Sequence, residues 1–272
     1  MLVAAAVCPC PPLLVPEVAA GAAPELDAAR VACADALGVL AAARPDLLVV
    51  VGPAGADARG RHSQGTPGSF RGFGVDLDVT LGTVENVVPN GASAEDDGTG
   101  GTGRTGGTGG TGATGDGRAL ACGPGRALPP SLAVAGWLLA RVGWAAAPVD
   151  GLGVEETTET ERCLQAGRDI AGRARRVALL VMGDASACRT LKAPGYLDDR
   201  AAPFDAAVAR ALRDADLAAL RALDAPLARE LKAAGRAPWQ VLAGAAEGAD
   251  LTGGLLYEDA PYGVGYLVAS WS

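Results

Sequence analysis

Two short apolar segments, separated by a long stretch rich in alanine and leucine, constrain the fold of this chain more than any other feature. Residues 2–7 and 47–51 each have the character of a buried β-strand, and each is followed by a proline-containing loop. Residues 24–43 between them begin with Pro and Glu and are typical of a helix. A strand, a helix and a strand at this spacing predict a parallel βαβ unit.

The rest of the chain continues this alternation. Further strands are expected at residues 177–182, 255–257 and 264–269. Helices are expected from Pro129 onward, after the capping-box pattern of Thr158 and Glu161, and around residues 204–212, 217–234 and 239–246. We therefore predict one α/β domain over residues 1–272, with a mostly parallel central sheet flanked by helices. Its functional face is expected at the carboxyl ends of the strands.

A low-complexity tract interrupts the pattern. Residues 98–115 read GTGGTGRTGGTGGTGATG and contain no apolar side chain larger than Ala. Such a segment cannot offset the entropy lost on ordering, so we expect a disordered insertion at about residues 90–126. A phosphate-binding loop is a weaker interpretation, because the tract lacks the flanking strand and helix and the Lys-Ser/Thr pair of such loops.

Charge and composition exclude several classes of function. The net charge of −8 opposes nucleic-acid binding, which depends on Lys and Arg contacts to phosphate. No apolar run approaches the roughly 20 residues of a membrane span, so no membrane partner is expected. The first residues lack a basic segment and meet prolines early, which predicts a cytoplasmic protein. The 6 cysteines are scattered and are expected to be reduced thiols.

Histidine is nearly absent from the sequence. The single histidine, His62, lies in a polar Gly/Pro-rich loop, so no site within one chain can use two imidazoles. An isolated loop histidine is usually solvated, but a role for His62 as a ligand or as an acid/base stays open. If Arg59, Arg61 and His62 fold over a pocket, they would hold an anionic ligand.

Short motifs at the predicted strand ends carry a resemblance to a known family. They are Cys8-Pro9-Cys10-Pro11-Pro12, Val51-Gly52-Pro53-Ala54, Gly183-Asp184-Ala185-Ser186-Ala187-Cys188, Asp198-Asp199-Arg200, Pro203-Phe204-Asp205 and Tyr262-Gly263-Val264-Gly265-Tyr266. In this order they resemble the B-subunit-like branch of the class III extradiol ring-cleavage dioxygenases, to which Memo-type proteins are related. The resemblance spans the chain apart from about residues 84–127 and the His62 loop.

The resemblance implies an iron site whose histidines this chain lacks. Family members cleave aromatic diols with O2 at Fe(II) held by two histidines and a carboxylate, and a further histidine acts as acid/base. Cys10 and Ala54 stand where the metal histidines are expected, and Ala187 stands at the acid/base position. The family's carboxylate ligand has no clear counterpart near residues 230–235. Asp184 and Ser186 match the family's Gly-Asp-x-Ser loop, with a local structural role and a pocket role equally open.

Thiols are an alternative source of metal ligands. Cys8, Cys10, Cys188 and His62 would form a soft site for Zn or Cu if the fold brought them together. Against this, we expect Cys8 and Cys10 to point to opposite sides of an extended segment, and free Cys is commonly a small buried residue. Arg189, Thr190 and Lys192 add donors near Cys188, with a solvated helix start as the simpler interpretation.

Three functional hypotheses follow. The first is a non-catalytic or repurposed descendant that binds a small aromatic or anionic ligand and needs no cofactor. The second is a ring-cleaving oxidoreductase that acts on a phenolic substrate with a non-standard metal site or with ligands lent by a partner subunit. The third is a thiol-based metal carrier. The pocket candidates are Asp184, Ser186, Cys188 and His62, with Cys10 at the metal position, and the resemblance implies association into a homo-oligomer.

Overall fold

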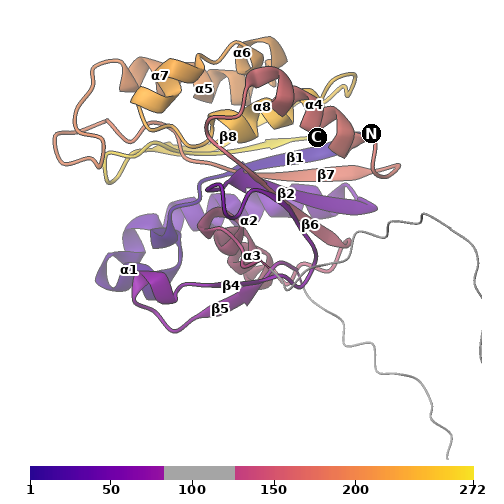
Figure 1. Ribbon diagram of the computed structural model, residues 1–272, viewed down its shortest axis with the longest axis horizontal. Coiled ribbons are helices and arrows are strands. Elements are labelled where there is room, and N and C mark those ends of the chain that lie inside the picture. The colour runs from indigo at the N-terminus through magenta and orange to yellow at the C-terminus, as the bar shows by residue number, and fades with distance from the viewer. Residues whose placement is uncertain (83–125) are drawn as a thin grey trace, which may run out of the picture.

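The computed structural model describes residues 1–82 and 126–272, and these form an α/β fold around one mixed central sheet (Figure 1). The Gly/Thr-rich tract and most of the insertion expected at residues 90–126 lie outside the described residues. The strands are β1 (Leu2–Cys8), β2 (Leu47–Pro53), β3 (Gly60–His62), β4 (Pro67–Ser69), β5 (Asp78–Thr80), β6 (Val149–Val154), β7 (Val177–Met182), β8 (Gly253–Asp259) and β9 (Tyr266–Trp271).

The centre of the sheet is parallel and its edges are antiparallel. Among the described residues the 7-stranded sheet has the order β3-β6-β2-β7-β1-β9-β8. Strands β6, β2, β7 and β1 pair in parallel, whereas β3, β9 and β8 run antiparallel to their neighbours. A short ribbon of β4 and β5 lies apart from this sheet. The fold class expected from the sequence is confirmed.

Helices cover both faces of the sheet, as the two layers in Figure 1 show. They are α1 (Pro16–Ala19), α2 (Asp27–Ala42), α3 (Pro130–Arg141), α4 (Thr160–Ala171), α5 (Ala201–Arg213), α6 (Leu217–Arg221), α7 (Ala225–Glu230) and α8 (Arg236–Ala245). Helices α2 and α3 bury their apolar sides in one core, and α4, α5 and α8 bury theirs in the other. Because the central strands are covered on both faces, their sequences are continuous apolar runs rather than alternating ones.

The place of β7 in the sheet, between β1 and β2, could not be predicted from local sequence pattern. The segments at residues 2–7 and 47–51 are parallel strands, as expected, but they do not pair with each other. Strand β7 pairs with both, through Val7 opposite Val181 on one side and Val51 opposite Val181 on the other. The pairing joins segments more than a hundred residues apart in the sequence.

Strand β6 is absent from the sequence-based prediction, and its glycines explain why. The segment reads VDGLGV, which has neither an apolar run nor a clean alternation. A Cβ on Gly151 would lie 2.8 Å from Leu81, and a Cβ on Gly153 would lie 2.6 Å from the carbonyl oxygen of Ala58. These glycines therefore let the chain around β3 approach β6 closely, at the cost of the usual strand signal.

Close backbone packing also joins α4 to α8. A Cβ on Gly167 would lie 2.0 Å from the carbonyl oxygen of Val241, and one on Gly244 would lie 2.1 Å from that of Leu164. The expected capping box at Thr158 and Glu161 is wrong, because the residue that caps α4 is Glu159 and no side chain hydrogen-bonds there.

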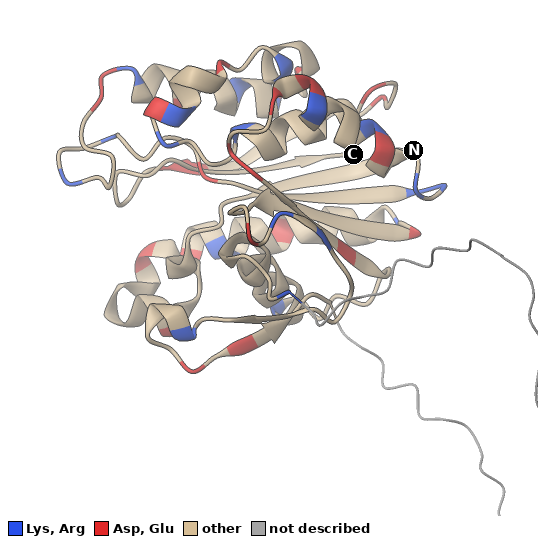
Figure 2. Cartoon of the chain, viewed as in Figure 1, with Lys and Arg blue, Asp and Glu red and all other residues tan. Residues whose placement is uncertain are grey.

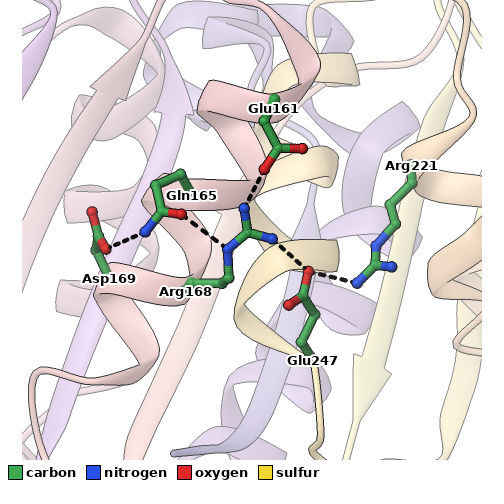
Figure 3. A network of polar contacts seen from close by, with 6 residues as sticks. All are labelled: Glu161, Gln165, Arg168, Asp169, Arg221 and Glu247. Atoms are coloured by element: carbon green, nitrogen blue, oxygen red, sulfur yellow. Dashed lines mark hydrogen bonds and ion pairs between the residues drawn. The ribbon is translucent and has the colours of Figure 1, made fainter.

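Figure 3 shows the polar network over this contact, in which Arg168 bonds to Gln165 and pairs with Glu161 and Glu247. Arg221 of α6 also pairs with Glu247, which lies in the turn after α8, so the network joins α4 and α6 to that turn. In the described part of the chain, no helix is both long and apolar enough to cross a membrane.

Candidate functional site

The carboxyl ends of the parallel strands surround a cavity of about 540 Å³, which we call the strand-end cavity. Its walls come from the loop after β1, the loop after β2, the start of α3 and the loop after β6. The lining residues are Cys10, Pro53, Ala54, Gly55, Ala56, Pro130, Ser131, Glu155, Glu156 and Thr157. Cys10 and Ala54, the positions at which the resemblance implies the metal histidines, therefore line one cavity although they are far apart in sequence.

Asp184 holds the loop that carries Cys10. The backbone N–H of Cys10 donates a hydrogen bond of 2.8 Å to Oδ1 of Asp184. Burial raises the pKa of the Asp184 carboxyl to about 7, although this hydrogen bond favours the charged form. Burial, followed by the negative charge of Asp184, raises the pKa of the Cys10 thiol well above its usual value. Cys10 therefore presents a neutral thiol to the cavity at physiological pH.

Tyr266 lies next to this pair. It is the first residue of β9, and its side chain is buried. Burial is the main cause that raises its pKa, and the charge of Asp184 adds to it. The phenol is therefore neutral and lies within electrostatic range of Asp184. The sequence motif at residues 262–266 includes Tyr266, but nothing in the motif gave it a role.

The acidic rim of the strand-end cavity escaped the sequence analysis. Glu155 and Glu156 directly follow β6, the strand that the sequence did not reveal. Had β6 been recognised, two carboxylates at the carboxyl end of a parallel strand would have been strong site candidates. Ser131 also lines the cavity, but its hydroxyl donates to the carbonyl oxygen of Pro53 at 2.6 Å.

Ser186 faces a different environment from Asp184. Its backbone N–H and its hydroxyl both donate to the carboxylate of Asp205, each at 2.8 Å. Arg189 pairs with the same carboxylate at 3.0 Å, so Arg189 is not simply solvated. Burial nevertheless raises the pKa of Asp205. Ser186 therefore holds its own loop against α5, and it does not line the strand-end cavity.

The cysteines proposed as a soft-metal set do not come together. Cys188 is buried, and its thiol lies 3.4 Å from the carbonyl oxygen of Leu231. Cys8 contacts Cys33, which raises the pKa of Cys8. The expectation that Cys8 and Cys10 point to opposite sides is wrong. Residues two apart on an extended chain share a face, and both cysteines pack into the same core.

His62 is neither solvated nor in the strand-end cavity. It ends β3, its side chain is 3% exposed, and its Nε2 lies 2.8 Å from the carbonyl oxygen of Ala58. The loop expected there is an edge strand paired with β6. Arg59, Arg61 and His62 do not converge, because Arg61 lines a separate hollow with Asp169 and Arg173.

These residues do not fit the Fe(II) centre that the resemblance implies. The two metal-histidine positions hold a thiol and a methyl group, and Ala187, at the acid/base position, does not line the strand-end cavity. Within residues 1–82 and 126–272, no three His, Cys, Asp or Glu side chains are gathered where they could hold a metal ion. We therefore assign no chemical step to iron.

Fold and site together define an α/β protein with a ligand-sized cavity at the carboxyl ends of its parallel strands. No family model matches the chain, and no curated protein matches it either. Among solved structures, the crystal structure of an uncharacterized protein from Escherichia coli K12 is similar over 99% of this chain and 99% of that chain. The sequence identity is 15% and the TM-score is 0.47, a likeness that carries no argument about function.

Proposed function

We propose that this chain is a non-catalytic or repurposed small-molecule-binding protein of the extradiol dioxygenase type, with its ligand in the strand-end cavity. The observation that carries the proposal is the meeting of Cys10 and Ala54 in the wall of that cavity. Ligand sites of open α/β folds lie at this end of the sheet. The volume of about 540 Å³ is also in the range of small-molecule sites.

The lining of the cavity favours a small aromatic ligand with hydrogen-bond donors. Pro53, Ala54 and Pro130 offer apolar surface without bulky side chains, so a flat ring has room to lie against them. At the rim, the carboxylates of Glu155 and Glu156 accept hydrogen bonds from hydroxyl groups on such a ring. Cys10 contributes a neutral thiol to the wall.

Catechol is a suitable probe. Protein purified without a tag and stripped of metal is titrated with catechol by calorimetry, and the same protein is then tested for O2 uptake after Fe(II) is added. We expect catechol to bind without O2 uptake. Ala56→Trp, which places an indole at the exposed wall of the cavity, should weaken binding at least about tenfold, a change of about 1.4 kcal/mol. Ala206→Trp on the exposed side of α5 is the matched control and should bind as the wild type does.

Each other outcome contradicts the proposal in a distinct way. If Ala56→Trp binds catechol with the affinity of the wild type, the ligand does not bind in the strand-end cavity. Iron-dependent O2 uptake with catechol would favour the alternative hypothesis, a ring-cleaving oxidoreductase with a non-standard metal site. Stoichiometric Zn or Cu that is lost in Cys10→Ala would instead favour a thiol-based metal carrier.

A further inference from the structure

A second and larger cavity opens beside the first. It has a volume of about 770 Å³, and it shares Glu155 and Thr157 with the strand-end cavity. The residues that line it are Arg59, Gly60, Arg126, Leu152, Gly153, Val154, Glu155, Thr157, Thr158, Glu159, Arg162 and Ala166. We call it the arginine cavity. Because two residues belong to both walls, the two cavities adjoin each other.

Three guanidinium groups face two carboxylates in the arginine cavity. Arg59 lies 3.3 Å from Glu155, and this is the one ion pair within the lining as far as the described residues show. Arg126 donates to the backbone carbonyl oxygen of Arg59, and among the described residues neither it nor Arg162 has a carboxylate partner. Glu159 is exposed and forms no ion pair with the described residues.

This local excess of positive charge stands in a chain whose net charge is −8. Guanidinium groups present several N–H donors in one plane and match the oxygens of carboxylate and phosphate. Among the residues that the structure describes, no Lys or Arg lines the strand-end cavity, whereas its rim carries Glu155 and Glu156. An anionic group is therefore favoured in the arginine cavity and disfavoured in its neighbour.

We propose that the arginine cavity binds the carboxylate or phosphate group of a small ligand whose uncharged part occupies the strand-end cavity. This inference rests on the proposed function and adds to it the charge of the ligand. Arg162 and Arg126 bind the anion directly, since neither forms an ion pair with a carboxylate in the described part of the chain. Arg59 interacts with both Glu155 and the anion, because its guanidinium already forms an ion pair with Glu155.

The test compares probes that differ in charge but little in shape. Benzoate, phenyl phosphate and the uncharged benzamide are titrated into the full chain by calorimetry. Benzoate and phenyl phosphate should each bind at least about tenfold more tightly than benzamide, a factor typical of one charge-assisted contact. The preferred anion then shows whether carboxylate or phosphate is the natural group. Added salt should reduce the advantage of the charged probes, because the cavity is open to solvent.

Two arginine variants make the test specific. Arg162→Gln should reduce the affinity for benzoate and phenyl phosphate about tenfold and leave that for benzamide unchanged. Arg175→Gln makes the same change of charge at an exposed position near the amino ends of the strands, and it should alter none of the affinities. Circular dichroism of both variants confirms that the fold is retained.

The outcomes separate this inference from the proposed function. If benzamide binds and Ala56→Trp weakens it, but benzoate has no advantage or Arg162→Gln has no effect, the anion site is wrong and the proposed function stands. If inorganic phosphate binds through Arg162 while benzamide and catechol do not bind, the anion site stands and the proposed function is wrong. If no probe binds at millimolar concentration, both are overturned.

Discussion

Asp184→Asn should reduce the loss of stability that we expect for this protein between about pH 5 and pH 8. The pKa of Asp184 is raised to about 7 in the folded protein, whereas a carboxyl in the unfolded chain has a pKa near 4. Between these values the folded protein binds more protons than the unfolded chain, so the free energy of unfolding falls as pH rises. The stabilisation is fully present below about pH 4 and is lost as pH passes through about 7.

The size of the effect follows from the two pKa values. A shift of about three units corresponds to about 4 kcal/mol in full, of which about 2.6 kcal/mol falls between pH 5 and pH 8. Asp184 is half-buried, so solvent screening reduces this to about 2 kcal/mol. Asparagine keeps the oxygen that accepts the N–H of Cys10, and it does not ionise.

Urea denaturation of the wild type and the variant at both pH values measures the difference directly. Asp198→Asn is the control, because the ion pair with Arg200 lowers the pKa of Asp198 to about 2, well below this window. The control should therefore keep the pH dependence of the wild type. If Asp184→Asn loses as much stability between the two pH values as the wild type does, Asp184 is ionised in the fold and the reasoning is refuted.

Three further predictions follow from the packing. Gly167→Ala should destabilise the protein by about 1–3 kcal/mol, because its Cβ would meet the carbonyl oxygen of Val241. Gly38→Ala, in open space on α2, should stabilise the protein by about 0.5–1 kcal/mol. Equal changes in the free energy of unfolding for Gly167→Ala and Gly38→Ala, measured by urea denaturation, would contradict the packing of α4 on α8. Asp205→Ala should cost about 3–5 kcal/mol of stability, because Ser186 and Arg189 lose their carboxylate partner, while the folded fraction should still bind catechol. A loss of binding without a loss of stability would place Asp205 in the site. Cys10→His combined with Ala54→His should raise the affinity for Zn²⁺ at least about tenfold by calorimetry. If the double variant binds Zn²⁺ no more tightly than either single variant, the two side chains do not reach a common ion.

The sequence revealed the elements whose burial is nearly complete. Residues 177–182 form β7 as expected, and every residue of this strand is buried. Phe204, Val208 and Leu212 were expected on one side of a helix, and all three are buried in α5. Such patterns can be read locally because an apolar stripe or run must be covered wherever it lies in the fold.

Elements stabilised by close backbone contact were missed. Strand β6 carries glycines where strands usually carry branched side chains, and β3 is a short edge strand in a polar segment. His62 therefore seemed to lie in a loop, although pairing with β6 buries it. These features depend on neighbours that are distant in sequence, so no local pattern announces them.

By itself, the sequence predicted the α/β fold, and it placed Cys10, Ala54 and Ala187 where the resemblance implies imidazoles. Only the tertiary structure decided which positions meet. The parallel alignment of β1, β2 and β6 brings Cys10 and Ala54 to one cavity, whereas Ser186, two residues after Asp184, faces Asp205 instead. The physical reason is that burial of apolar side chains is encoded along each segment, while the direction of a polar side chain depends on which partner the packed chain offers it.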